Sequence, residues 1–166
     1  MNNYIVKDNF LSKDHYDSLK NFLYSNQIPW YHVEKQITGS NEDSSGFFTF
    51  FWYENYRPSH PSFDLDIRPI LKELQCVAPI QIRSNLLLKT KEGASDWHVD
   101  FNFPTTTAIL YFTTCNGSTV LKINGEEVII DAVENRLLEF DGRIEHRAIW
   151  QTDVKKRIVI NLNYIK

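Results

Sequence analysis

The chain has 166 residues, a formal net charge of −3, and a composition that is 42% hydrophobic and 14% aromatic. This apolar content is enough for a packed interior and excludes an intrinsically disordered chain, and the length predicts one domain spanning residues 1–166. The slightly acidic balance disfavours nucleic acid as a partner.

Nothing in the sequence indicates a membrane or secreted protein. The first residues lack the basic and apolar regions of a signal peptide, and no stretch approaches the ~18 apolar residues of a membrane span. Cys76 and Cys115 have no CxxC spacing and are expected as free thiols in a reducing compartment. We therefore expect a cytoplasmic location and no membrane partner.

The N-terminal part, residues 1–79, predicts two helices and two aromatic strands. Ser12 is a candidate N-cap for a first helix that ends near Tyr24, and a second helix is expected from about residue 61 to 74. Strands are expected at 30–38 and 47–56. The polar residues 39–46 that join them are expected to form a mobile loop, and the sequence does not indicate what this loop covers.

From residue 80 onward the sequence predicts almost only strands. Short runs rich in Ile, Val, Leu, Thr, Tyr and Phe are separated by Gly, Asn, Asp and Pro. The expected strands are 80–90, 97–101, 106–113, 119–123, 126–131, 136–140, 145–151 and 156–164. About eight short strands at this spacing predict a double-stranded β-helix, the jelly roll of cupins, in residues 80–166, with the two N-terminal α-helices as cladding.

Two histidines and one aspartate form the candidate metal site. His98 and Asp100 stand two residues apart in the expected strand 97–101, so both side chains should project from one face. With His146 they form the two-histidine, one-carboxylate set that holds Fe(II) in non-haem oxygenases and leaves coordination positions open. An HxD pattern also arises by chance on solvent-facing strands. The remaining histidines lack a second ligand at metal spacing and are interpreted as surface or packing residues: His15, His32 and His60.

Arg157 strengthens the metal hypothesis because of its place in the last expected strand. The alternate face of that strand is apolar and is expected to face the helices: Ile158, Ile160, Leu162 and Tyr164. Arg157 should then point into the barrel, where a guanidinium is costly unless a buried anion pairs with it. The distal carboxylate of 2-oxoglutarate fits that requirement through a bidentate contact. A surface ion pair at the mouth of the barrel is the alternative.

Five segments, taken in order, resemble the Fe(II)/2-oxoglutarate-dependent oxygenases: HVD (98–100), TTAILYF (106–112), NGSTVLKI (116–123), NRLLEFDGRIEH (135–146) and RIVINLNY (157–164). The chain looks most similar to small prolyl-4-hydroxylase-like members, including compact versions encoded by bacteriophages, for which the location would be the host cytoplasm. The resemblance implies Fe(II), 2-oxoglutarate as cosubstrate and O2. It also implies His98, Asp100 and His146 as iron ligands and Arg157 as the cosubstrate anchor.

Further positions carry weaker expectations from the same resemblance. Tyr111 matches a tyrosine that hydrogen bonds the distal carboxylate of 2-oxoglutarate. The alternative interpretation of Tyr111 is an ordinary core residue without a role in cosubstrate binding. Asn85 offers an amide to cosubstrate or substrate, and Leu121 is a candidate wall of the cosubstrate pocket or plain core. Val159 stands where many relatives have Ser or Thr, and Leu88 stands where a tyrosine is common. One cosubstrate hydrogen bond is therefore missing or replaced.

The expected activity is hydroxylation of an unactivated C–H bond, with a prolyl or other residue in a peptide or protein as the favoured substrate. A free amino acid or another small metabolite is the next candidate. Two other classes remain open: a cupin-like Zn or Mn protein that does not use 2-oxoglutarate, and a non-catalytic jelly-roll binding module. The sequence does not indicate the oligomeric state.

Overall fold

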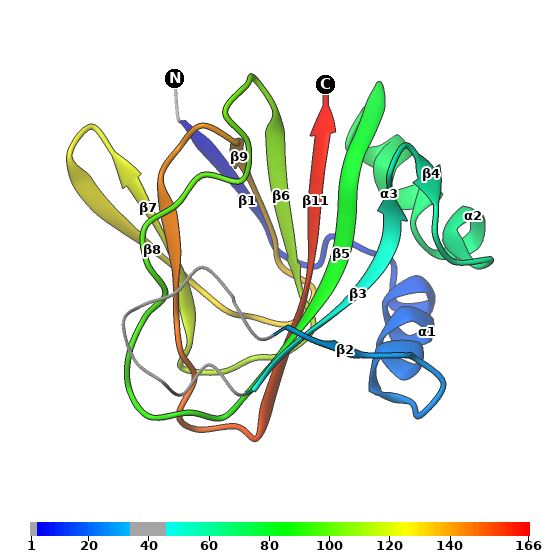
Figure 1. The fold of residues 1–166 in the computed structure, drawn as a ribbon, viewed down its shortest axis with the longest axis horizontal. Helices are drawn as coiled ribbons and strands as arrows, with labels where there is room; N and C mark the ends of the chain where they lie inside the picture. Colours follow the sequence, from blue (N-terminus) through cyan, green and yellow to red (C-terminus); the bar gives the residue numbers. More distant parts are fainter. Residues whose placement is uncertain (1–2, 34–45) are drawn as a thin grey trace.

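The structure, a computed structural model, describes residues 3–33 and 46–166, arranged as two antiparallel sheets with helices on one outer side (Figure 1). The larger sheet has the strand order β1-β9-β6-β11-β5-β3-β2, with β4 paired to β3, and the smaller has the order β10-β7-β8. The strands are β1 (Tyr4–Lys7), β2 (Tyr31–His32), β3 (Phe47–Glu54), β4 (Arg57–Pro58), β5 (Ala78–Leu88), β6 (Thr106–Tyr111), β7 (Ser118–Ile123), β8 (Glu126–Asp131), β9 (Leu137–Asp141), β10 (His146–Ile149) and β11 (Lys156–Ile165).

The alternation of β11 separates two hydrophobic cores. Ile158, Ile160, Leu162 and Tyr164 are fully buried in the core between the large sheet and the helices. Val159 belongs to the second core, which lies between the two sheets. The face assignment made from the sequence is confirmed, because a strand that is buried on both sides sends successive side chains into different layers.

Helix α1 (Lys13–Tyr24) begins where the sequence predicts. Ser12 is its N-cap, and the Ser12 side chain accepts a hydrogen bond from the His15 amide at 3.4 Å. Its buried side chains belong to the core on the helical side of the large sheet: Tyr16, Leu19 and Leu23.

The second expected helix is wrong as one continuous element. The structure divides it into α2 (Phe63–Asp66) and α3 (Arg68–Glu73), with Ile67 between them. Pro69 lies in the first turn of α3. Since proline lacks an amide hydrogen and its ring clashes with the carbonyl four residues earlier, a helix through this position is interrupted. The described residues thus contain three helices, where the sequence predicted two.

The expected strand at 97–101 is also wrong. This segment makes only two isolated bridges with β10, Ala94 to Ile149 and His98 to His146. The two bridges are four positions apart along this segment and three positions apart along β10, and this one-residue mismatch prevents a regular ladder. The ligand pair His98 and Asp100 therefore lies on an irregular segment, which is joined to β10 at His98 by backbone hydrogen bonds to His146.

Other strand predictions agree with the structure within a few residues at each end, and 126–131 agrees at both ends. Strand β1 was not predicted, because its four residues show no hydrophobic alternation. Most of the predicted loop 39–46 and the second half of the predicted strand 30–38 lie outside the described residues. In the part of the chain that is described, none of the helices has the length and apolar character needed to cross a bilayer.

Candidate metal centre

Three side chains converge at the edge of the smaller sheet. His146 begins β10, and His98 lies opposite it on the irregular segment, followed two residues later by Asp100. One ligand atom from each of the three lies within 4.8 Å of the others. Distances of this size between donor atoms suit a single ion bound by all three residues. The structure thus brings together the three side chains that the sequence singled out.

The two imidazoles are oriented by backbone carbonyls. The Nδ1 atom of His98 lies 3.0 Å from the carbonyl oxygen of Asp96, and Nδ1 of His146 lies 3.1 Å from that of Ile144. A carbonyl oxygen can only accept, so Nδ1 donates in both rings and each Nε2 retains its lone pair. This arrangement is common in metal sites, where a carbonyl fixes the ring and its tautomer.

Buried polar atoms at the centre have no protein partner. His146 Nε2 and Asp100 Oδ2 are both buried and make no hydrogen bond. Burial lowers the pKa of His146 below its ordinary value, which favours the neutral, ligating form of the ring. Unpaired buried polar groups are costly, and a cation bound to both atoms would remove that cost. Two imidazoles and one carboxylate suit Fe(II), although Zn and Mn accept the same donors.

Arg157 lies in the same cavity as the two histidines. It is only 2% exposed, and its Nη1 donates to the carbonyl oxygens of Ser118 at 3.3 Å and Ile149 at 3.1 Å. Its Nε is buried without a partner, and no described carboxylate forms an ion pair with it. The cavity is lined by His98, His146 and Arg157 among others. A buried guanidinium paired only with carbonyls is suited to binding an anion.

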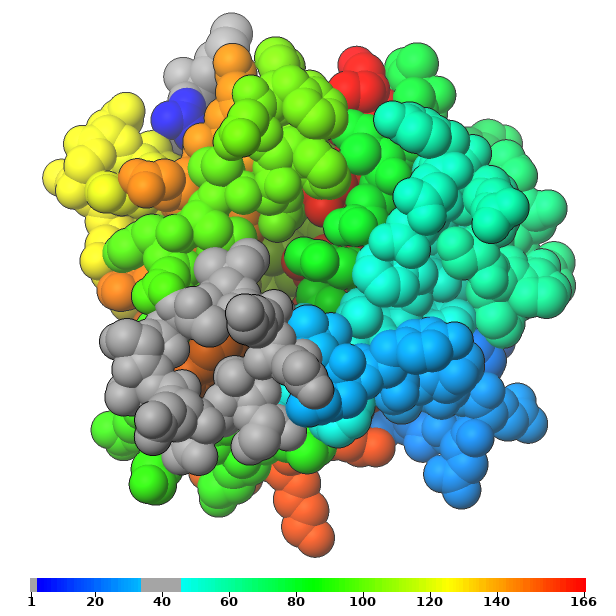
Figure 2. All heavy atoms as spheres, in the orientation of Figure 1, coloured from blue at the N-terminus to red at the C-terminus, as the bar shows by residue number. Residues whose placement is uncertain are grey.

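The cavity opens on the face of the molecule drawn in Figure 2. The surface there is hollowed between the lime-green segment around residue 100 and the green atoms of β5. Asn85 and Leu87 of β5 and Val159 and Asn161 of β11 line the cavity from the large sheet. Thr119 of β7 and Ala148 of β10 line it from the small sheet. The candidate site is therefore the space between the two sheets.

Tyr111 lies beside Arg157, but its hydroxyl group is already engaged. The Tyr111 ring centroid is 5.7 Å from the guanidinium carbon, and its hydroxyl donates to Thr119 Oγ1 at 2.7 Å. Burial raises the pKa of the Tyr111 phenol, so the hydroxyl stays protonated near neutral pH. Because Thr119 accepts from Tyr111, its own hydroxyl hydrogen is free to donate into the cavity. Thr119 was missed in the sequence, and the only available signal was its position two residues before Leu121 on the same strand.

Asn85 and Leu121 occupy different environments. Asn85 lines the cavity, where its Oδ1 accepts a hydrogen bond from Thr49 Oγ1 at 3.3 Å. Leu121 is fully buried in the core between the sheets and pairs with His146 in the β7–β10 ladder. It is not among the described residues that line the cavity, and it packs in the core beside His146, because directly paired residues of neighbouring strands share one face of the sheet.

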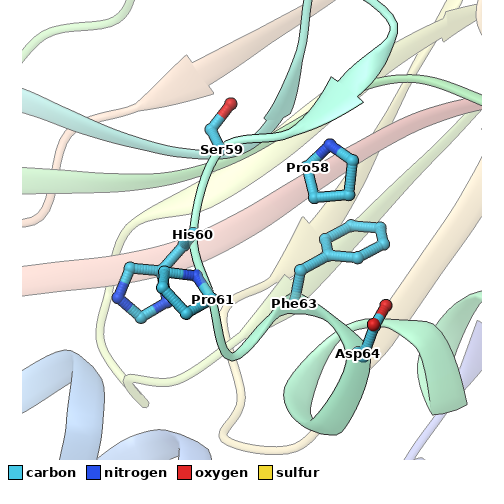
Figure 3. Close-up of a pocket in the computed structure, with 6 residues that line it drawn as sticks. All are labelled: Pro58, Ser59, His60, Pro61, Phe63 and Asp64. Atoms are coloured by element: carbon cyan, nitrogen blue, oxygen red, sulfur yellow. The ribbon is translucent and has the colours of Figure 1, made fainter.

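A second, shallow pocket lies near α2, away from the candidate centre (Figure 3). It is lined by Pro58, Ser59, His60, Pro61, Phe63 and Asp64. His60 Nδ1 is 2.8 Å from the Ser62 hydroxyl, and its ring packs against Phe50 and Trp52. Asp64 is paired with Arg68. The pocket offers no group of metal ligands, and His60 is a packing residue.

No protein-family model matches the sequence, and no curated protein matches it. The fold, in contrast, is that of solved 2-oxoglutarate- and Fe(II)-dependent oxygenases. A prolyl-4-hydroxylase from Pseudomonas putida matches with a TM-score of 0.72 and 10% identity, over 99% of this chain and 93% of that chain. A prolyl hydroxylase from Trichoplax adhaerens, solved with a hypoxia inducible factor peptide fragment, matches with a TM-score of 0.71 and 15% identity, over 99% and 84%.

A 2OG-Fe(II) oxygenase family oxidoreductase from Burkholderia pseudomallei is also similar, with a TM-score of 0.69 and 9% identity, over 98% of this chain and 85% of that chain. The TM-scores establish a shared architecture, so the expected jelly-roll fold is confirmed, and at identities this low the similarity shows the fold alone. The chemistry of the site has to be argued from the residues of this chain.

Proposed function

We propose that the chain is a single-domain Fe(II)- and 2-oxoglutarate-dependent dioxygenase that hydroxylates an unactivated C–H bond. The observation that carries the proposal is the presence of Arg157, buried and without an acidic partner, in the same cavity as His98 and His146, two of the three candidate metal ligands. A metal centre alone has no need of a buried cation nearby. A dianionic cosubstrate that chelates the metal at one end would bind the metal through that end and the buried cation through its other carboxylate.

Each residue has a role in this proposal. His98, Asp100 and His146 hold Fe(II) through His98 Nε2, an Asp100 carboxylate oxygen and His146 Nε2. Arg157 binds the distal carboxylate of 2-oxoglutarate through its guanidinium, and the Thr119 hydroxyl, oriented by Tyr111, donates to the same carboxylate. Thr119 would thereby compensate for the absence of a hydroxyl at Val159. When bound, iron with 2-oxoglutarate and O2 supplies the oxidising chemistry, and the protein supplies position and electrostatics.

For the substrate, we propose a prolyl or other residue within a peptide. Support comes from the shared architecture with two prolyl hydroxylases, one of them solved with a peptide. A free amino acid or small metabolite is the second candidate. Identity of 15% or less carries no information on specificity by itself, so the substrate is tested separately from the cosubstrate.

The proposed function is tested by anaerobic addition of Fe(II) and then 2-oxoglutarate to the metal-free protein. We expect one equivalent of Fe(II) to bind, followed by a weak visible metal-to-ligand band when 2-oxoglutarate is added. A cupin-like metal protein that does not use 2-oxoglutarate would bind the metal and develop no such band. A non-catalytic binding module would hold the same amount of metal before and after the substitution Asp100→Ala.

A further inference from the structure

Arg83 is a further arginine in the cavity, besides Arg147 and Arg157. It lies on β5, where its backbone is directly opposite Asn161 of β11. The residues that line the cavity include Arg83 and Asn161 together with His98 and His146. Arg83 is thus placed where a substrate, held next to the metal, would contact the wall of the large sheet.

The charge on Arg83 is not neutralised by a hydrogen-bonded carboxylate. Its side chain is 23% exposed, and the closest ion-pair contact among the described residues is Nη2 to Asp100 Oδ1 at 3.9 Å, beyond hydrogen-bond distance. The Nε atom is buried without a partner. In the proposed function Asp100 binds the metal, so its negative charge is shared with a cation and is less available to Arg83.

The other two arginines in the cavity have their anions. Arg147 is paired with Glu127 at 3.1 Å, and its guanidinium carbon lies 4.4 Å from the Trp97 ring centroid. The proposed function gives the distal carboxylate of 2-oxoglutarate to Arg157. The described residues that line the cavity include no Asp or Glu. One guanidinium, that of Arg83, therefore remains without a hydrogen-bonded anionic partner after metal and cosubstrate are accounted for, since its contact with Asp100 is 3.9 Å long.

A hydrogen-bond acceptor lies beside this cation. Asn161 Oδ1 is buried and has no partner, and Asn161 also lines the cavity. A cation next to an acceptor matches a carboxylate that has an N–H group close to it. Amino acids have this combination, both as free molecules and as acidic residues within a peptide.

We propose that Arg83 binds a carboxylate of the substrate, with Asn161 accepting from an adjacent N–H group. The inference rests on the proposed function and deepens it, because it names the chemistry that the substrate brings to the cavity. The carboxylate has two possible sources, the α-carboxylate of a free amino acid and the side chain of Asp or Glu in a peptide.

The test is calorimetric titration of the full-length protein loaded with Mn(II) and 2-oxoglutarate, which reports binding without turnover. One arm uses free amino acids, including L-proline, each paired with its primary amide. The other arm uses blocked proline-containing peptides with Asp, each paired with its Asn counterpart. In at least one arm the acid should bind at least about ten-fold more tightly than its amide, which is the scale of one charge-assisted contact. The arm that shows the difference identifies the source of the carboxylate.

Arg83→Gln should remove the preference for the acid, and Arg83→Lys should retain part of it because the charge remains. Arg147→Gln is the matched control, since Arg147 lines the same cavity but is already paired, and it should keep the preference. Equal binding of acids and amides in both arms, or a preference that survives Arg83→Gln, would overturn the inference. So would an Arg83→Gln protein that loses Mn(II) affinity while its preference is unchanged, because Arg83 would then only position Asp100.

The same titrations separate the two proposals. If the wild-type protein binds Mn(II) but not 2-oxoglutarate, the proposed function fails. If it binds both and shows no preference for the acids, the proposed function stands and only the role of Arg83 fails.

Discussion

The main chains of His98 and His146 exchange two hydrogen bonds, of 3.0 and 2.9 Å, and their ring centroids lie 4.3 Å apart. The two histidines are thus held together by backbone atoms that do not depend on either ring. Removing one imidazole takes away a ligand atom and leaves the bridge in place. This separation makes the metal site testable without disrupting the fold.

The first prediction concerns the metal ligands. Asp100→Ala and His146→Ala should each weaken Fe(II) binding by about 100-fold or more, since a direct ligand matters at least as much as the groups that orient it. Anaerobic metal titration measures the affinity. His32→Ala is the control, because His32 is exposed and lies outside the candidate centre. An Asp100→Ala protein that retains wild-type affinity for Fe(II) would contradict the assignment.

The second prediction concerns cosubstrate binding. Arg157→Ala should weaken 2-oxoglutarate binding by about 3 kcal/mol, or roughly 150-fold, because one carboxylate loses a buried, charge-assisted partner. Calorimetric titration of the Mn(II)-loaded protein gives the affinity, and Mn(II) binding itself should change little. Arg147→Ala, in the same cavity, serves as the comparison. Equal 2-oxoglutarate affinities in wild-type and Arg157→Ala proteins would rule out the anchor.

The third prediction uses the close approach of Gly117 to Arg157. A Cβ atom at position 117 would lie 3.0 Å from Arg157 Nη1, 3.0 Å from the Ile149 carbonyl oxygen and 3.1 Å from the Gln151 amide nitrogen. Two of these atoms belong to the backbone, so Gly117→Ala should destabilise the fold by about 1–3 kcal/mol. It should also weaken 2-oxoglutarate binding, because the guanidinium must move.

Gly125→Ala separates these two effects. Gly125 has a φ of +85° and no atom within 4 Å of an added Cβ, so alanine there costs stability through backbone strain alone. Denaturant unfolding should show a loss in both variants, and calorimetry should show weaker cosubstrate binding only for Gly117→Ala. Unchanged cosubstrate binding in Gly117→Ala would mean that Arg157 tolerates displacement.

The fourth prediction concerns alkaline pH. Tyr164 is fully buried and donates to Glu139 Oε2 at 3.0 Å, and burial together with the Glu139 charge raises its pKa far above the ordinary value of 10.0. The unfolded chain therefore loses the phenolic proton at a lower pH than the folded chain does. Stability contributed by Tyr164 is complete below pH 10 and is lost as the pH rises above it.

The measurement compares wild-type and Tyr164→Phe proteins between pH 8 and pH 11. The free energy of unfolding should fall more steeply with rising pH in the wild type, because phenylalanine has no proton to lose. Identical slopes for the two proteins would show that Tyr164 titrates with an ordinary pKa in the folded state.

Several features of the site could be predicted from the sequence because they depend on short-range regularities. The two-residue period of β11 placed Arg157 opposite the apolar face formed by Ile158 and Ile160, and the structure has this arrangement. The chemistry of His98, Asp100 and His146 indicated a metal centre, and their ligand atoms do converge. Local patterns of this kind survive in the fold because strand geometry fixes the direction of successive side chains.

Contacts between strands could not be predicted in the same way. The hydrogen bond from Tyr111 to Thr119 and the position of Arg83 opposite Asn161 depend on the register of strands far apart in the sequence. The mismatch of one residue between the bridges at 94 and 98 made the segment irregular where regular alternation was expected. Sequence by itself determined which residue types were available and which face of β11 each side chain took. Only the tertiary structure decided which of them meet in the cavity, because pairing register is set by the packing of the whole sandwich.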